Sequence, residues 1–392
     1  MTLFLFTASY PYGYTETFLE EEVLILSSQF ERVEVVPLYG VGNPTRMVPE
    51  NFVVHKPLIE KKVSIKNIKV LLLCSFSRLF WDDFLKKKVY ISFKRLKTWA
   101  IAYLNTCIIA ESDVIRDIEH RMEEHDICYY YWGKGANLMS IRWKGKARHI
   151  SRFHGEWDLW EESSGNYAPL REKLAKSLDL AVFVSNKGEQ YFKNKYPYCK
   201  TLTSRLGAKD VGIVRKSNDG VLRVVSCSAV YPLKRVPLIY STLTKMTQYK
   251  IEWTHIGGGE DFEKLREIVN SNRYDHLKVT LLGHVSHDDV TMYYQNNIVD
   301  LFINVSTNEG VPVSIMEAIS FDIPIVATNV GGTSEVVTSE VGELISANPS
   351  EEEIKKAIDT IYAGDYTPKI YWSKEYNSKK NFTEFCEIIK NL

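Results

Sequence analysis

The sequence lacks an excess of charge of either sign, because 49 Lys and Arg residues balance 49 Asp and Glu residues among its 392 positions. The chain-wide positive charge that nucleic-acid-binding proteins use to attract phosphates is therefore absent, and we expect no nucleic-acid partner. Hydrophobic residues make up 45% of the chain and charged residues 25%, which also excludes a disordered protein.

Long apolar runs are missing as well. The first nine residues contain no basic residue and too short an apolar run for a signal peptide. No stretch reaches the ~18 consecutive apolar residues that a membrane span needs. These absences predict a cytoplasmic protein whose only contact with a membrane is peripheral, at the inner face.

Cysteine is scarce and scattered. The six cysteines form no C-x-x-C pair, and none of them lies beside a cluster of histidines. Because metal and redox motifs need such spacings, we expect six reduced thiols, no metal site and no cofactor.

What the sequence does contain is a repeated alternation of short apolar runs with helical patterns. A helix is expected over residues 15–28, with Thr15 as its cap. The runs that we predict as strands cover residues 3–8, 33–38, 127–132, 149–153 and 180–185, then 222–226, 251–256, 278–282, 301–305 and 323–328. This alternation is typical of parallel sheets with helices on both faces.

A polar linker over residues 209–220 separates the two sets of strands. We therefore predict an α/β protein with two Rossmann-like domains facing across a cleft. The predicted domains cover residues 1–212 and 213–370, and a C-terminal helix within 371–392 packs back on the first domain. In open sheets of this kind a ligand binds beyond the carboxyl ends of the strands.

Residues 61–97 break the charge balance. They contain eleven basic residues against Asp82 and Asp83, interleaved with leucine and aromatic residues. A basic amphipathic segment of this kind is typical of proteins that lie on anionic membranes, and here Phe76, Phe80 and Trp81 would insert. The alternative is a helical hairpin whose apolar side is domain core and whose lysines are solvated.

The strongest candidate site is the run over residues 306–318, in which Glu309 and Glu317 are separated by seven residues. Pro312 suits the first turn of a helix, so Glu309 lies in the loop before the helix and Glu317 within it. The exposed amides at such a helix start would bind an anion such as a phosphate. Carboxylates beside a phosphate site favour a ligand with hydroxyl groups, which sugars supply. The alternative is an ordinary strand-loop-helix with solvated glutamates.

The longer run over residues 300–318, together with residues 324–335, resembles the donor site of the retaining glycosyltransferases of family four, also called glycosyl transferases group 1. The hallmark of that family is a pair of glutamates with this spacing, and the resemblance extends more thinly over the whole chain. It implies the two-domain GT-B fold, a nucleotide-sugar donor as substrate, and transfer with retained anomeric configuration.

The resemblance gives both glutamates a role in donor binding. Glu309 resembles the carboxylate that faces the hydroxyls of the donor sugar. Glu317 resembles the one that accepts hydrogen bonds from both ribose hydroxyls. The family loop that cradles the sugar and the diphosphate corresponds here to Gly310, Val311 and Pro312.

Lys234 resembles the family lysine that binds the donor diphosphate. The chemistry requires a cation there, because the leaving diphosphate gains negative charge as the glycosidic bond breaks. The family usually has an arginine five residues earlier, and this chain has Ala229 at that position. Arg235 is the candidate substitute in the phosphate clamp.

The glycine-rich turn that begins at Gly257 resembles the family turn that lines the donor side of the cleft. It lacks the last glycine of a dinucleotide fingerprint, which disfavours a nicotinamide dehydrogenase. His284 and Val285 resemble the segment whose backbone contacts the nucleotide base. Backbone contacts leave the base open, and we favour a UDP-sugar over a GDP-sugar.

The resemblance also assigns residues in the first domain. Gly13 corresponds to a glycine near the diphosphate and the acceptor, and His154 to a histidine near the transferred sugar. Glu156 and Asp158 are candidates for holding or deprotonating the acceptor hydroxyl.

No Asp-x-Asp motif occurs, so the metal-carrying motif of the other common glycosyltransferase fold is missing. We therefore expect a metal-independent, retaining glycosyltransferase that acts on a glycan or lipid-linked acceptor in bacterial surface polysaccharide synthesis. The alternatives are a catalytically inactive GT-B subunit, which Ala229 favours, and a nucleotide-sugar epimerase of the same fold.

Overall fold

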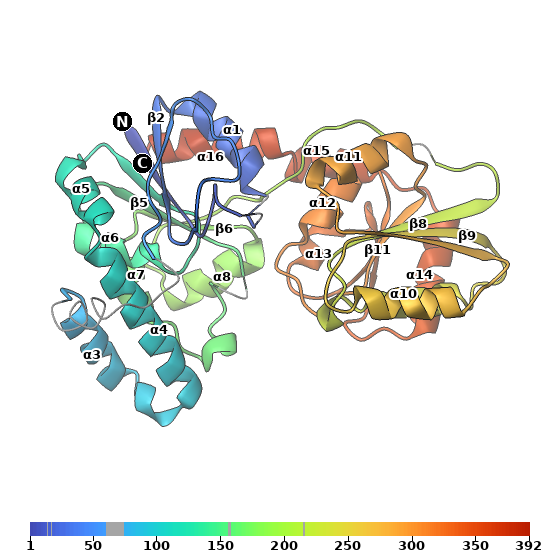
Figure 1. Ribbon diagram of the computed structural model, residues 1–392, viewed down its shortest axis with the longest axis horizontal. Coiled ribbons are helices and arrows are strands. Elements are labelled where there is room, and N and C mark those ends of the chain that lie inside the picture. Colours follow the sequence, from blue (N-terminus) through green and yellow to red (C-terminus); the bar gives the residue numbers. More distant parts are fainter. Residues whose placement is uncertain (14, 17, 60–73, 156–157, 215) are drawn as a thin grey trace. The chain divides into compact units, whose positions relative to one another are not determined.

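The apolar runs of the sequence form two parallel sheets, one in each of two structural units (Figure 1). The computed structural model describes residues 1–392 except 14, 17, 60–73, 156–157 and 215. Unit 1 comprises Met1–Arg205 and Phe382–Leu392, and unit 2 comprises Leu206–Asn381. These changes of unit lie a few residues before the predicted boundary at 212 and some way after the one at 370. That the domains face each other across a cleft stays a prediction.

Unit 1 contains a sheet with the strand order β3-β2-β1-β4-β5-β6-β7. Its strands are β1 (Thr2–Thr7), β2 (Arg32–Pro37), β3 (Phe52–Val54), β4 (Ile127–Tyr130), β5 (Arg148–Phe153), β6 (Leu180–Phe183) and β7 (Thr201–Thr203). All neighbouring strands in it are parallel. The helical elements of its chain are α1 (Leu19–Gln29), α3 (Ser77–Lys86), η1 (Val89–Ile91), α4 (Phe93–Ala110), α5 (Asp113–Arg121), η2 (Ala136–Leu138), α6 (Met139–Trp143), η3 (Glu162–Ser164), α7 (Arg171–Ser177) and α8 (Asn186–Lys195).

Side chains that alternate along β1 explain why both sheet faces are covered. Leu3 and Leu5 belong to a core with α1 and with the end of α16 (Ser378–Lys390), whereas Phe4 and Phe6 belong to a core with α4, α6 and α7. Successive residues of a strand point to opposite faces, so a strand buried on both sides is mostly apolar. This explains the unbroken apolar runs of the sequence.

Unit 2 repeats the plan with the strand order β10-β9-β8-β11-β12-β13. Its strands are β8 (Val221–Cys227), β9 (Lys250–Ile256), β10 (Leu277–Gly283), β11 (Leu301–Asn304), β12 (Ile325–Thr328) and β13 (Gly342–Ile345). Its helical elements are η4 (Pro232–Lys234), α9 (Val236–Leu243), α10 (Phe262–Ser271), α11 (His287–Asn296), α12 (Val313–Ser320), α13 (Thr333–Val336), α14 (Glu351–Ala363) and α15 (Pro368–Glu375). The prediction of two Rossmann-like sheets is therefore confirmed.

The first helix begins later than the sequence pattern predicts. It starts at Leu19 rather than at Thr15, and no side chain caps it. Glu16 has a left-handed backbone with φ of 60°, and its carboxylate accepts hydrogen bonds from the amides of the preceding loop. A residue in that conformation cannot belong to an α-helix, so the helix can begin only after it.

The expectation of six free thiols is wrong for two of them. Cys74 and Cys107 form a disulfide, while Cys128, Cys199, Cys227 and Cys386 are free. The two partners are 33 positions apart in the sequence and become neighbours only when α3 folds against α4. No local spacing could have indicated that pairing.

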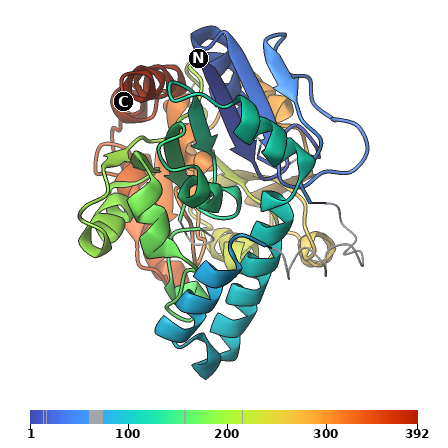
Figure 2. The same ribbon diagram turned by 90° about the vertical axis from the view of Figure 1, so that its left-hand side faces the viewer.

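The described part of the basic segment lies in a helical hairpin of α3 and α4, which extends from unit 1 in Figure 2. Phe76 and Phe80 are buried in the core of unit 1, so the prediction that they insert into lipid is wrong, whereas Trp81 is half exposed. Lys61, Lys62, Lys66 and Lys69 lie outside the described residues. Among the residues described, no helix is both long and apolar enough to cross a bilayer.

Candidate functional site

Each sheet has one place where the winding of the chain reverses. In unit 2, β8 lies between β9 and β11, and in unit 1, β1 lies between β2 and β4. At such a point the loops after the two neighbouring strands diverge and leave a crevice at their carboxyl ends, where open α/β sheets bind ligands. In unit 2 these are the loops after β8 and β11, which carry Lys234 and Glu309.

An ion pair joins the two loops. Lys234 Nζ lies 2.6 Å from Glu309 Oε1, and the two side chains are 18% and 11% exposed. The amide of Asn304, the last residue of β11, donates to the same carboxylate oxygen over 3.2 Å. A backbone hydrogen bond of 2.8 Å from Thr307 N to Leu233 O also connects the two loops. The structure thus brings together two residues that the sequence predicted for one site.

Arg235 connects the loop after β8 to the backbone that follows β11 and β13. Its guanidinium donates to the carbonyl oxygens of Val305, Ser306 and Ala347 and to the side chain of Asn348. Burial lowers the pKa of this guanidinium. These four hydrogen bonds occupy most of its five donors, so the geometry favours a positioning role over the phosphate-binding role assigned to it from the sequence.

The Glu309 loop is shaped by close backbone packing. Gly331, with φ of 53°, approaches the loop so closely that a Cβ there would lie 1.7 Å from the carbonyl oxygen of Glu309. Gly332 N donates to Gly310 O over 2.7 Å. A residue with a Cβ at position 331 would clash with this carbonyl oxygen, so only glycine allows the backbone at 331 to pack against the Glu309 loop and fix its conformation. The loop continues through Gly310 and Val311 to Pro312, which lies at the position just before α12 rather than in the first turn, where the sequence pattern places it.

Glu317 lies within α12, as the spacing predicts. Its Oε1 lies 2.8 Å from His287 Nε2, at the start of α11. Burial raises the pKa of the Cys227 thiol, at the end of β8, to about 12, with Glu317 adding to the rise and Lys234 opposing it. Both charges are therefore close to the carboxyl end of β8.

The glycine-rich turn lies beside the same strand ends. Gly257 has φ of 136°, and a Cβ on it would lie 1.9 Å from the carbonyl oxygen of Ser228. Its amide donates to Gly283 O over 2.9 Å, which places the turn against His284. Val285 lines a cavity of about 310 Å³ together with Tyr293 and other residues of β9, β10 and α11.

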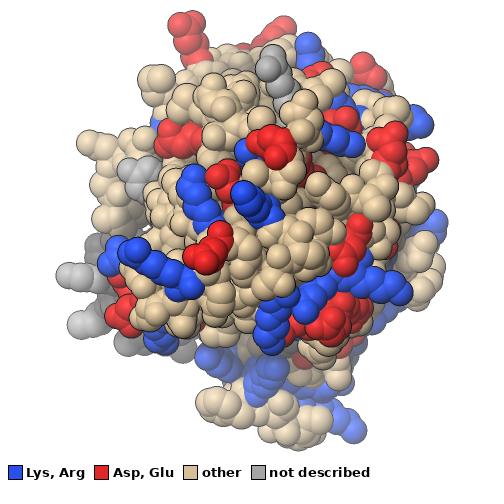
Figure 3. Space-filling model, turned by 90° about the vertical axis from the view of Figure 1, so that its right-hand side faces the viewer, with Lys and Arg blue, Asp and Glu red and all other residues tan. Residues whose placement is uncertain are grey.

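Figure 3 shows basic and acidic side chains interspersed on one face of the molecule.

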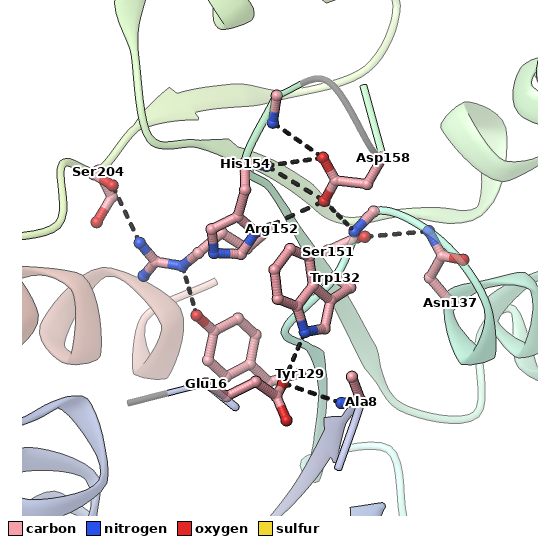
Figure 4. Close-up of polar contacts among 12 residues, drawn as sticks. Ala8, Glu16, Tyr129, Trp132, Asn137, Ser151, Arg152, His154, Asp158 and Ser204 are labelled. Atoms are coloured by element: carbon pink, nitrogen blue, oxygen red, sulfur yellow. Dashed lines mark hydrogen bonds and ion pairs between the residues drawn. The ribbon is translucent and has the colours of Figure 1, made fainter. Parts of the chain in front are cut away.

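In unit 1 a buried carboxylate organises the loop after β1. Glu16 accepts hydrogen bonds from the amides of Ala8, Ser9 and Tyr10 and from Trp132 Nε1, at 2.6–3.0 Å. Figure 4 shows the contacts with Ala8 and Trp132. Because Trp132 follows β4, this carboxylate joins the two loops at the reversal point of unit 1. Gly13, with φ of 65°, lies on the loop that Glu16 holds.

His154 directly follows β5 and lies among aromatic rings. The centroid of its ring is 4.4 Å from that of Trp132 and 5.0 Å from that of Tyr131. Neither ring nitrogen has a hydrogen-bond partner among the residues that the structure describes, although Nδ1 lies 3.5 Å from Asp158 Oδ2. With Nδ1 beside Asp158, Nε2 is the nitrogen that retains its hydrogen-bonding capacity for a ligand.

Asp158 is 4% exposed and accepts hydrogen bonds from the amides of Gly133, His154 and Gly155 (Figure 4). Burial would raise the pKa of this carboxyl, but the interaction with His154 and the backbone hydrogen bonds outweigh it, so the pKa is lowered. A carboxylate held in this way positions the His154 loop, and its oxygens have little capacity left for an acceptor hydroxyl. Glu156 lies outside the described residues.

Sequence reasoning missed several residues that hold the site together. Glu16, Asn304 and His287 contact predicted residues or their loops, but each is an ordinary polar residue without a motif. Arg152 is fully buried in unit 1, where it contacts Glu22 and donates to Ser204 O, which supports the strand that ends beside His154. The only available signal was a position at or near the end of an apolar run.

Comparison with known proteins points to one family. Residues 214–379 match the family Glycosyl transferases group 1. The O-antigen biosynthesis glycosyltransferase WbnH of Escherichia coli is 30% identical over 129 residues, which cover 33% of this chain and 34% of that protein. The GPI3 subunit of phosphatidylinositol N-acetylglucosaminyltransferase from Saccharomyces cerevisiae is 27% identical over 173 residues, 41% of this chain and 38% of that protein. The match thus spans little more than a third of either relative.

Solved structures match the whole chain. The lipopolysaccharide outer core galactosyltransferase WaaB has a TM-score of 0.67 at 14% identity, over 100% of this chain and 99% of that chain. Alr3699/HepE of Anabaena in complex with UDP has a TM-score of 0.66 at 14% identity, over 100% of both chains. Two Rossmann-like units with such neighbours define the GT-B fold. Residues 214–379, which lie within unit 2, are similar to the glycosyl transferases group 1 family.

The buried carboxylate of Asp158 gives a first prediction. In Asp158→Asn one acceptor oxygen becomes a donor, so buried backbone amides lose their partner and stability falls by about 1–3 kcal/mol for each. A lowered pKa stabilises the fold fully above the ordinary Asp value of about 4 and is lost as the pH falls through the folded value. Thermal melts should show a constant deficit from pH 7 to 5 that shrinks below pH 4.

The matched control is Asp82→Asn, because Asp82 is exposed on α3. It should melt like the wild-type protein at every pH. A variant at Asp158 that is as stable as the wild type at pH 7 would contradict the positioning role.

Proposed function

We propose that this protein is a retaining glycosyltransferase that moves a sugar from a nucleotide-sugar donor to a glycan or lipid-linked acceptor in bacterial surface polysaccharide synthesis. One observation carries the proposal: Lys234, Glu309 and Glu317 gather at the carboxyl ends of β8 and β11, the reversal point of unit 2. A cation paired with one carboxylate, with a second carboxylate on the following helix, suits a ligand with both phosphates and hydroxyls. A UDP-sugar is the favoured donor, supported by the UDP complex of the similar HepE structure.

The reaction follows from the charges of this half-site. Lys234 exchanges Glu309 for the donor diphosphate, and Glu309 turns to the hydroxyls of the sugar. The bond between C1 of the sugar and the phosphate oxygen breaks while the acceptor oxygen bonds to C1 from the same face. The leaving phosphate takes the acceptor proton. Lys234 and the amides at the start of α12 stabilise the negative charge that develops, and we propose that no metal ion is required.

His154 completes the proposal from unit 1. Its Nε2, which has no partner among the described residues, suits a hydrogen bond to the transferred sugar, and the packing of Trp132 and Tyr131 fixes the ring. The inactive-subunit alternative has support from Ala229 and from the engagement of Arg235 by backbone carbonyls, which leave one cation on the diphosphate. Release of nucleoside diphosphate from a donor distinguishes an active transferase from that alternative.

The ion pair makes the roles of the two glutamates separable. Glu317→Ala removes the acceptor of the ribose hydroxyls, and losing one charged hydrogen bond of about 1.5–3 kcal/mol weakens UDP binding by about tenfold or more. Glu309→Ala frees Lys234 for the diphosphate, so UDP should bind equally well or slightly tighter while donor turnover falls. Calorimetric titration with UDP and a donor hydrolysis assay measure both effects.

The control variant is Glu340→Ala, an exposed glutamate of the same unit. It should change neither quantity. Equal losses of UDP affinity in the two site variants would show that the division of roles is wrong.

We further propose that the α3–α4 hairpin docks on an anionic membrane at the cytoplasmic face. Leu85, Ile91 and Phe93 are 66%, 63% and 83% exposed at the end of the hairpin, beside the run of lysines at 86–88. Exposed apolar side chains next to cations are the combination that anionic lipid surfaces attract, at about 1 kcal/mol for each basic residue.

Vesicle co-sedimentation tests the docking. The protein should bind phosphatidylglycerol vesicles, ignore phosphatidylcholine vesicles, and dissociate as salt screens the charges. Replacing Lys86, Lys87 and Lys88 by Glu should abolish binding. The same charge change at Lys250, Lys356 and Lys374, which are exposed in unit 2, should leave binding intact. Wild-type protein that ignores anionic vesicles at low salt would contradict the docking.

A further inference from the structure

Unit 1 contains a cavity of about 330 Å³ at its own reversal point. Its walls come from the ends of β1 and β4, from the loop before α7 and from one face of α4. Most of the lining side chains are aromatic or aliphatic, among them Leu38, Trp132, Trp160 and Leu174. Apolar walls of this extent suit a hydrocarbon portion of a ligand better than a bare sugar, whose hydroxyls would lose their hydrogen bonds to water.

The α4 wall follows helical spacing. Thr98, Ile101, Ala102 and Asn105 all line the cavity, and at steps of three and four residues they share one helix face. Ile101 and Tyr39 are 48% and 43% exposed, so they form the mouth of the cavity. Asn105 Nδ2 donates to the Tyr39 hydroxyl over 3.3 Å, which joins the two sides of the mouth.

The exposed surface of α4 continues from the cavity mouth at Ile101 to the end of the hairpin at Phe93. Phe93, exposed at the first position of α4, lies eight residues before Ile101, a distance of about 12 Å along the helix at 1.5 Å per residue. Lys94 and Lys97 are exposed between them. An apolar chain lying along this stretch would pass between cations and reach the cavity mouth.

The charged groups of the cavity favour an anion. Lys134 and Arg171 line it, against the single carboxylate of Asp158, whose oxygens are engaged by backbone amides. Arg171 is 8% exposed, and its Nη2 donates to the main-chain oxygen of Asp158. Its Nη1 has no partner within the described part of the chain. A buried cation without a paired anion is costly, and an anionic group nearby relieves that cost.

We propose that this cavity is the acceptor site and that it takes a lipid phosphate, with the phosphate near Lys134 and Arg171 and the hydrocarbon chain leaving over Ile101 along α4. The assignment rests on the proposed transferase function and selects the lipid-linked acceptor over a soluble glycan. The hairpin that contacts the membrane would then also guide the acceptor chain into the site.

Decyl phosphate is a probe with both chemical features. Trp132 and Trp160 line the cavity, so intrinsic tryptophan fluorescence of the full-length protein should report its binding. Decyl phosphate should bind more tightly than decanol, which lacks the anion, and than glucose 1-phosphate, which lacks the chain. Equal binding of decanol would overturn the anionic part of the proposal, and equal binding of glucose 1-phosphate would indicate a soluble phosphate ligand instead.

Two alanines of α4 form a matched pair. Ala102→Phe fills the cavity and should weaken decyl phosphate binding by about tenfold or more. Ala100→Phe places the same ring on the exposed side of the helix and should leave binding unchanged. If Ala102→Phe fails to fold, Ile101→Glu at the exposed mouth should weaken decyl phosphate by charge repulsion. Unchanged binding in both cavity variants would overturn the assignment.

Lys134→Ala isolates the contribution of charge. Lys134 is exposed, so its loss should weaken decyl phosphate by about fivefold at most and leave decanol unaffected. Decyl phosphate binding is measured without any nucleotide. A protein that binds decyl phosphate but releases no nucleoside diphosphate from any donor would refute the proposed function alone, and the converse result would refute the acceptor assignment alone.

Discussion

Both units depend on one constraint, the reversal of winding beside the first strand of a parallel sheet. Once β1 lies between β2 and β4, and β8 between β9 and β11, the loops at those strand ends must diverge. In unit 2 the loops carry Lys234 and Glu309, and in unit 1 they surround Glu16 and Trp132. The strand order therefore determines where the loops with the candidate site residues lie, whatever side chains those loops carry.

Charged side chains then fix those loops by binding backbone groups. Glu16 and Asp158 accept amide hydrogen bonds in unit 1, and Arg235 donates to carbonyl oxygens in unit 2. Such loops have no secondary structure of their own, and their buried polar groups need partners. A single ionised side chain supplies several strong hydrogen bonds at once, which explains why these residues lie at the reversal points. The predicted functional groups His154 and Glu309 lie directly beside them.

Much of this arrangement could be predicted from the sequence, because strands buried on both faces leave unbroken apolar runs. The edge strands β3, β7 and β13 escaped prediction, since they are short and their side chains are only partly buried, so they leave no apolar run. The pair of glutamates was recognisable from its spacing, whereas the ion pair of Glu309 with Lys234 is visible only in the structure, and the roles of these residues stay predictions. The start of α1, the burial of Phe80 and the Cys74–Cys107 disulfide depend on contacts between distant segments, which no local pattern records.

The most direct test of a retaining transferase site is the stereochemistry of donor hydrolysis. Purified protein would be incubated with UDP-sugars and GDP-sugars without an acceptor, and proton NMR would follow the released sugar. We predict slow hydrolysis of one donor with the configuration at C1 retained in the first-formed product. Inverted configuration, or no binding and no hydrolysis of any nucleotide sugar, would contradict the assignment of Lys234, Glu309 and Glu317 to a retaining donor site.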